Sequence, residues 1–180
     1  MKIAAISGSL RTGSSNTAVL RAAARLAPAG VEVILFQGIA ELPFFNPDLD
    51  GDQVPAPVGA MRSLVGTVDG ILISSPEYAR GVAGVLKNAL DWLVGSHEFP
   101  EKPVALINTS PRATHALAAL TLTLETMSAR IAREACVTLP LLGRPCDEHG
   151  IVADPVLAEP LRSAMEDFAL FIRAAEGKVS

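Results

Sequence analysis

Short apolar segments alternate with amphipathic segments along the chain. Continuous apolar or β-branched runs predict buried strands, and they span Lys2–Ser7, Glu32–Phe36, Gly70–Ser74, Pro103–Asn108 and Ala135–Leu139. Apolar residues at three- and four-residue spacing predict helices, and they span Thr17–Ala27, Val58–Val68, Gly84–Val94, Ala116–Arg133 and Pro155–Ala174. The pattern is therefore a strand followed by a helix, repeated five times.

Near-continuous apolar strands interleaved with helices predict a parallel sheet covered on both faces. Five parallel strands in one 180-residue domain predict an α/β, doubly wound sheet of order 2-1-3-4-5. In that order the winding reverses between strands one and three, and ligands bind at their carboxyl ends. We therefore expect the chemistry of the protein just after Ser7 and just after Ser75.

The segment from Gln37 to Pro57 interrupts the alternation. It contains four prolines and several Asp and Gly residues, a composition that predicts a long loop with little regular structure. Loops of this length inside a compact domain usually carry function or lie at an interface.

Composition excludes several classes of function. The formal net charge is −4, which argues against nucleic acid as a partner because phosphate binding requires a basic face. No apolar run approaches the ~18 residues of a membrane span, so no membrane partner is expected. Cys136 and Cys146 form no CxxC pair and no metal-ligand spacing. We expect free thiols, no bound metal and a cytoplasmic location.

The segment after the first strand reads GSLRTGSSNT and leads into a helix. The N-terminus of a helix offers free N–H groups and a positive dipole end, and hydroxyl and guanidinium donors strengthen such an anion site. An ordinary loop with Ser14 or Ser15 as helix cap would explain one serine but not the whole string. The segment therefore predicts a phosphate site, although it contains neither GxGxxG nor GK[ST].

The segment after the third strand reads SSPEYARGVAG. Pro76 fixes the chain beyond the strand, and Gly81 and Gly84 would allow close approach of the backbone to a flat ligand. Tyr78 could lie against an aromatic face. An ordinary turn with an incidental tyrosine explains this loop equally well by itself, and its place beside the first loop favours ligand binding.

The strings GSLRTGSSN and PEYARGVAGVLKNALDW closely resemble the NAD(P)H-dependent FMN reductase family. That family has a flavodoxin-like fold and includes quinone, azo-dye and chromate reductases. The resemblance implies FMN as cofactor, NADPH or NADH as co-substrate, and a small acceptor such as a quinone, free flavin or metal oxyanion. It also implies a homodimer or homotetramer.

Matching positions carry the family's cofactor contacts to this chain. The resemblance assigns the FMN phosphate to Ser9, Arg11, Ser15, Asn16 and Thr17. It assigns the isoalloxazine ring to Pro76, Glu77, Tyr78 and Gly81, and a third contact to the segment after strand four, which includes Ser110. No side chain is assigned a catalytic role, because hydride transfer is the cofactor's own chemistry.

The chain departs from the family pattern at a few places. Ala83 stands where the family often has proline, and Arg112 and His115 stand where it often has glycines. For His115 a solvated or capping role is favoured over catalysis. Lys87 and Asp91 predict a surface ion pair, and by resemblance Asn88, Asp91 and Trp92 are expected at a dimer interface.

Two other classes of function remain open. A flavodoxin-type electron carrier would bind FMN without oxidising NAD(P)H, and steady-state NADPH oxidation with a quinone discriminates this class. A non-catalytic module would take up no FMN, which the intact phosphate loop disfavours.

Overall fold

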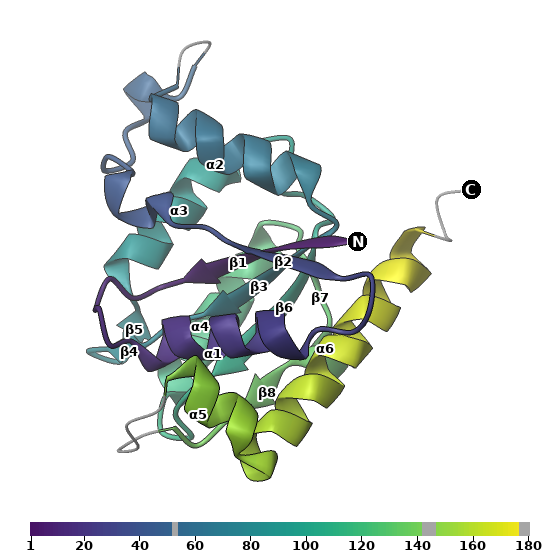
Figure 1. Cartoon of the computed structure of the whole chain (residues 1–180). Helices are drawn as coiled ribbons and strands as arrows, with labels where there is room; N and C mark the ends of the chain where they lie inside the picture. Colours follow the sequence, from purple (N-terminus) through teal and green to yellow (C-terminus); the bar gives the residue numbers. More distant parts are fainter. Residues whose placement is uncertain (52–53, 142–146, 177–180) are drawn as a thin grey trace.

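The computed structural model describes residues 1–51, 54–141 and 147–176 and has a parallel sheet between two layers of helices (Figure 1). The strand order is β2-β1-β3-β6-β7, and β8 also pairs with β6. All pairs within this sheet are parallel. The strands of the sheet are β1 (Lys2–Ser7), β2 (Glu32–Leu35), β3 (Gly70–Ser74), β6 (Pro103–Asn108), β7 (Arg130–Ile131) and β8 (Val137–Thr138).

Helices cover both faces of the sheet. One face packs against α1 (Ser15–Leu26), α5 (Glu148–Ala153) and α6 (Pro155–Glu176). The other packs against α2 (Ala56–Thr67), α3 (Gly84–Val94) and α4 (Thr114–Thr126).

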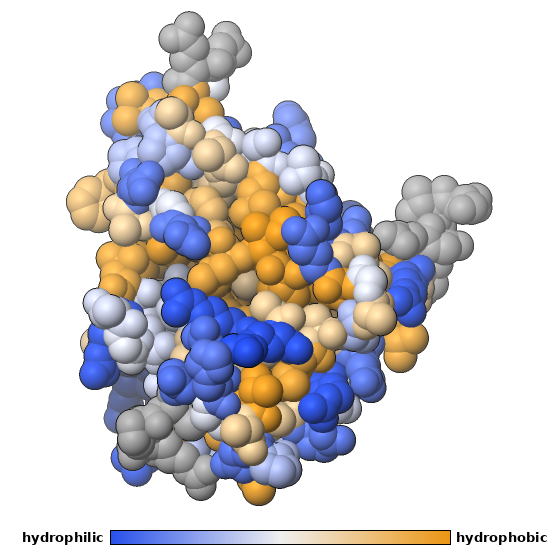
Figure 2. All heavy atoms as spheres, in the orientation of Figure 1, coloured by the Kyte–Doolittle hydropathy of each residue, from blue (hydrophilic) through white to orange (hydrophobic). Residues whose placement is uncertain are grey.

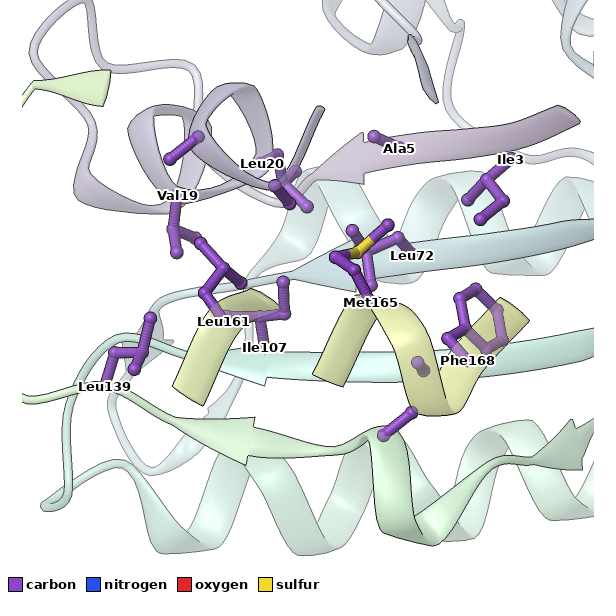
Figure 3. Packing of buried hydrophobic residues seen from close by; sticks show 14 of the residues in the cluster. Ile3, Ala5, Val19, Leu20, Leu72, Ile107, Leu139, Leu161, Met165 and Phe168 are labelled. Carbon is purple, nitrogen blue, oxygen red and sulfur yellow. The ribbon is translucent and has the colours of Figure 1, made fainter. Parts of the chain in front are cut away.

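Alternation along each strand divides the core between these two faces. In β1, Ile3 and Ala5 belong to the α1–α6 core, and Ala4 and Ile6 belong to the α2–α4 core. Successive side chains of a strand point to opposite faces, which explains why the strand reads as a continuous apolar run. Figure 3 shows the first core, where Phe168 of α6 and other apolar side chains pack against the sheet. Burying each Leu, Ile or Phe side chain contributes about 1.5–3 kcal/mol.

The structure confirms the doubly wound α/β architecture and corrects its last strand. The expected strand Ala135–Leu139 is reduced to β8, and β7 precedes it, so the sheet has six strands in place of five. A 3-10 turn at Arg133–Ala135 separates the two short strands. Cys136 lies just before β8, and its sulfur accepts from the N–H of Leu106 in β6 at 3.4 Å. Burial raises the pKa of this half-buried thiol; Cys146 lies outside the described residues.

The expected helix Ala116–Arg133 ends early, at Thr126. Ser128 has φ of 63°, and the N–H of Ala129 donates to the carbonyl of Leu124 at 2.9 Å. The N–H of Ser128 itself donates to the carbonyl of Glu125 at 3.0 Å. These two bonds form a Schellman motif. A serine occupies the left-handed position where glycine is usual, so the sequence gives little sign of this stop.

The Pro-rich segment folds back onto α3, and this corrects the assignment of Trp92 to an interface. The indole N–H of Trp92 and the amide N–H of Asn88 both donate to the carbonyl of Pro43, at 2.8 and 3.0 Å. Asn88 also accepts from the N–H of Phe45 at 2.8 Å, and the Phe45 ring meets the Trp92 indole edge-on. Trp92 is 0% exposed. Its side chain therefore anchors a loop inside the chain, while Lys87 and Asp91 form the expected surface pair.

The edge strand β2 remains partly open. Val33, Ile34 and Leu35 are only half-buried, and Figure 2 shows apolar surface in the middle of this view, between α1 and α2. Within the part of the chain that the structure describes, no helix is long and apolar enough to cross a membrane.

We expect Asn88→Ala to lower the free energy of unfolding by about 1–3 kcal/mol, because it removes two hydrogen bonds and leaves the N–H of half-buried Phe45 without its partner. Lys87→Ala on the same helix breaks only an exposed pair and should cost no more than about 0.5 kcal/mol. Urea unfolding of the two variants measures both values. Equal losses would show that the two hydrogen bonds of Asn88 contribute nothing to stability.

Candidate functional site

A cavity of about 400 Å³ opens at the carboxyl ends of β1, β3 and β6, as the reversal of winding predicts. Its volume lies within the range of small-molecule sites, ~300–1,000 Å³. Of the residues assigned to the cofactor from sequence, eight line the cavity: Ser9, Arg11, Ser15, Asn16, Pro76, Glu77, Tyr78 and Ser110. Thr17 and Gly81 do not line it.

Three loops form the cavity, and they follow β1, β3 and β6. The first two loops diverge directly after the last hydrogen bond between β1 and β3. The N–H of Gly8 donates to the carbonyl of Ser74 at 2.8 Å, directly after the last paired residues of β1 and β3. A Cβ at Gly8 would lie 2.4 Å from the hydroxyl oxygen of Ser75 and 2.8 Å from its Cβ. Glycine is therefore required at position 8 by close approach, a requirement that sequence reading did not detect.

The first loop is held by hydroxyl groups. Ser14 caps α1 by accepting from the N–H of Thr17 at 3.3 Å, so of the two candidate cap residues, Ser14 and Ser15, the cap is Ser14. The hydroxyl of Thr17 lies 2.8 Å from that of Ser7, so Thr17 ties the helix to β1. Ser9 accepts from the N–H of Arg11 at 3.4 Å, which shapes the turn that carries Arg11.

Asn16 joins the ends of three structural elements. Its amide oxygen accepts from the hydroxyl of Ser74 at 2.9 Å and from that of Thr109 at 3.3 Å. These partners come from the end of β3 and from the residue after β6, and Asn16 itself is buried in the first turn of α1. The side chain thus fixes the start of α1 against the sheet at the base of the cavity.

The start of α1 is suited to bind an anion. The backbone N–H groups of Ser15 and Asn16 lie in the first helical turn, where no intrahelical acceptor exists. Arg11 lines the same cavity, and no ion pair to it occurs in the described part of the chain. N–H groups, a positive helix end and a guanidinium match the donors that a phosphate requires.

The second loop is a hairpin that sequence reading missed. It pairs β4 (Glu77–Tyr78) with β5 (Gly81–Val82). Ala79 and Arg80 at its tip have φ of 49° and 59°, the backbone of a type I′ turn, which Asn-Gly usually forms. Tyr78 is 58% exposed at the cavity, as a ring-stacking residue would be.

The third loop follows β6 and is shaped by its own side chains. Asn108 both accepts from the N–H of Ser110 at 3.2 Å and donates to its carbonyl at 2.7 Å. The hydroxyl of Ser110 accepts from the N–H of Arg112 at 3.3 Å. Sequence reading overlooked Asn108 as a lining residue. Its position at the end of a strand beside the point of reversal was the available signal.

Glu77 is the one carboxylate among the residues that line the cavity. It accepts from the N–H of Ala116 in the first turn of α4 at 2.8 Å. The positive end of α4 therefore already faces a carboxylate, while that of α1 does not. Of the two helix starts, that of α1 is therefore the better suited to attract an anion. Arg112 lines the cavity, but Arg80 and His115 are exposed outside its lining, which agrees with a non-catalytic His115.

The residues present fit FMN. The donor-rich start of α1 suits its phosphate, and the open tyrosine-bearing hairpin suits a planar ring. Nothing in the described residues gathers three or more His, Cys, Asp or Glu side chains as a metal site would.

Known proteins similar to this chain are flavoenzymes and quinone reductases. It is 38% identical over 115 residues to a quinone reductase of Escherichia coli, a match covering 61% of this chain and 60% of that protein. It is 39% identical over 112 residues to an NAD(P)H-dependent FMN reductase of Pseudomonas aeruginosa, with the same coverage. The similar region thus spans less than two thirds of each relative.

Similarity of structure extends further along the chain. The flavoenzyme NAD(P)H:(acceptor) oxidoreductase FerB from Paracoccus denitrificans superposes with a TM-score of 0.79 at 28% identity, covering 96% of this chain and 97% of that one. The fold is therefore of the flavodoxin-like type that the strand order predicted. The family model for NADPH-dependent FMN reductase matches residues 1–140, and the chain belongs to that family.

Proposed function

We propose that this protein is an NAD(P)H-dependent flavin oxidoreductase that reduces a small acceptor such as a quinone. The observation that carries the proposal is the cavity at the reversal of winding, where an unpaired helix N-terminus and Arg11 lie beside an open hairpin with Tyr78. FMN bound in this cavity would supply the hydride-transfer chemistry between NAD(P)H and the acceptor. The chain's residues bind and orient the cofactor and leave one side of the cavity open.

The alternative of an electron carrier has less support. The family whose model matches residues 1–140 is that of NADPH-dependent FMN reductase, and relatives that match over 115 and 113 residues are named as reductases. Arg112 gives the cavity a second guanidinium without an ion pair among the described residues, and a nucleotide phosphate could engage it. We infer a cytoplasmic enzyme with one flavin site in a single domain, with no nucleic acid or membrane partner.

For the phosphate site, we expect Arg11→Ala to weaken FMN binding by about 1.5–3 kcal/mol, because a hydrogen-bonded charge pair is lost. This is roughly a 10- to 150-fold rise in the dissociation constant. Fluorescence titration of the flavin-free protein measures it. Riboflavin, which lacks the phosphate, serves as the control and should bind wild type and variant alike. An equal loss with riboflavin would make Arg11 structural.

For turnover, we expect NADPH and a small quinone to use the same open side of the cavity in turn. Double-reciprocal plots should then be parallel, and each substrate should inhibit at high concentration. Intersecting lines would mean that both substrates bind together. No NAD(P)H oxidation by protein with FMN bound would favour the electron carrier.

For nucleotide choice, we expect Arg112→Ala to raise the KM for NADPH by roughly tenfold and to leave the KM for NADH nearly unchanged, because only NADPH carries the extra phosphate. Arg80→Ala, at the hairpin tip outside the cavity lining, is the matched comparison; the arginine that reads the phosphate is the one whose loss affects NADPH alone. Equal effects of Arg112→Ala on both nucleotides would remove it from phosphate recognition.

For assembly, we propose a homodimer or a dimer of dimers with the flavin site near the subunit boundary. The Pro-rich segment exposes two large apolar side chains, with Phe44 91% and Leu49 46% exposed, and exposed apolar surface of this kind marks interaction sites where it is continuous. We expect Phe44→Ser to shift the protein toward monomer in light scattering, while Leu170→Ser, on the exposed side of α6, should not. A wild-type monomer at micromolar concentration with FMN bound would contradict the proposal.

A further inference from the structure

The carboxylate of Glu77 connects two parts of the cavity that are separate in sequence. It belongs to the hairpin β4–β5, and the N–H of Ala116 that it accepts belongs to the first turn of α4, 39 residues further along. Helix α4 has no side-chain cap of its own, because its N-cap residue is Ala113. Glu77 therefore takes the place of the missing cap, from outside the helix.

The hairpin needs an external support. It has two residues in each strand, and isolated two-stranded hairpins are marginally stable at best. Its tip holds Ala79 and Arg80 in left-handed backbone, which costs about 1 kcal/mol or more for each residue that is not glycine. Contacts outside the hairpin must therefore maintain its shape.

Apolar packing supplies only part of that support. Both strands of the hairpin contact α4, but a small pocket of about 20 Å³ is lined by Val82 of the hairpin, by Ala116, Leu117 and Leu120 of the helix, and by residues of the sheet. Such a pocket has room for about one water, so the hairpin and the helix do not pack directly on each other there. The bond between Glu77 and Ala116 is the hydrogen bond that the structure shows between hairpin and helix.

We propose that Glu77 is a positioning residue that sets the distance between the second and third loops of the cavity. Its carboxylate holds the hairpin that carries Tyr78 against the start of α4, directly after the loop that contains Ser110 and Arg112. The inference rests on the proposed function, because these two loops are the walls between which the planar ring of the flavin would lie. Glu77 acts on the ring through the hairpin and donates nothing to it.

The ring position should depend on Glu77, and the phosphate position should not. We expect Glu77→Ala to raise the dissociation constants of FMN and riboflavin by about the same factor, roughly tenfold, which is the effect of losing one hydrogen bond to a charged group. Arg11→Ala should affect FMN alone. Glu77→Gln keeps an acceptor oxygen of the same reach, and it should hold both constants within about threefold of wild type.

A second variant separates positioning from helix capping. Ala113→Ser supplies α4 with a cap from its own N-cap position without connecting it to the hairpin. Combined with Glu77→Ala, and compared with Ala113→Ser alone, it should recover the melting temperature but not the flavin affinity. Recovery of both would reduce Glu77 to a helix cap and overturn the proposal.

We call the connection that Glu77 makes between the hairpin and the start of α4 the Glu77 clamp. Hydrogen exchange of the flavin-free protein tests this clamp independently of the cofactor. Amides of the hairpin and of the first turn of α4 should exchange faster in Glu77→Ala and at the wild-type rate in Glu77→Gln. If wild type bound no flavin while Glu77→Ala and Glu77→Gln showed this exchange pattern, the proposed function would fail and the clamp would stand. Unchanged hairpin exchange in Glu77→Ala overturns the clamp, as does exchange in Glu77→Gln as fast as that in Glu77→Ala. Where wild type binds flavin, unchanged flavin affinity in Glu77→Ala overturns it too.

Discussion

The hydrogen bond from Gly8 to Ser74 is the last connection between β1 and β3, and the cavity depends on it. Beyond this bond the two segments of the chain turn to opposite faces of the sheet. The segment after β1 leads into α1, and the segment after β3 leads into the hairpin and α3 (Figure 1). Because Gly8 has no side chain, the loop after β1 can begin in direct contact with Ser75 at the start of the loop after β3. The ligand-binding space thus begins where backbone pairing ends.

Polar side chains position the helices that begin at the carboxyl ends of these strands. Asn16 binds the hydroxyls of Ser74 and Thr109 and thereby sets the start of α1 relative to two strands. Two helices begin at the cavity, and among the described residues that line it the one carboxylate, that of Glu77, binds the start of α4. The positive potential that remains lies at α1 and at the guanidinium groups of Arg11 and Arg112. An elongated ligand with one anionic end would therefore have a preferred orientation.

Sequence reading predicted the features that follow from pattern. The buried strands and the donor-rich loop Gly8–Thr17 stand out because burial and anion binding require particular residue types. It failed where a residue acts against its usual preference. Ala79 forms a left-handed turn without glycine or asparagine. The family resemblance places Trp92 at a dimer interface. Its pairing with the carbonyl of Pro43 connects residues 49 positions apart, and no local pattern reveals it.

Left-handed backbone without glycine also occurs far from the cavity. Glu101 and Ser128 have φ of 61° and 63°, and the N–H of Glu101 donates to the carbonyl of Ser128 at 2.8 Å. Both lie beside the amino ends of β6 and β7, at the opposite edge of the sheet. Glycine at position 128 would relieve strain in a connection away from the loops that line the candidate site, whereas glycine at position 79 would make one of those loops more flexible. The same backbone geometry therefore offers a position for a stabilising glycine at one end of the sheet, and at the other end it helps to set the shape of the cavity.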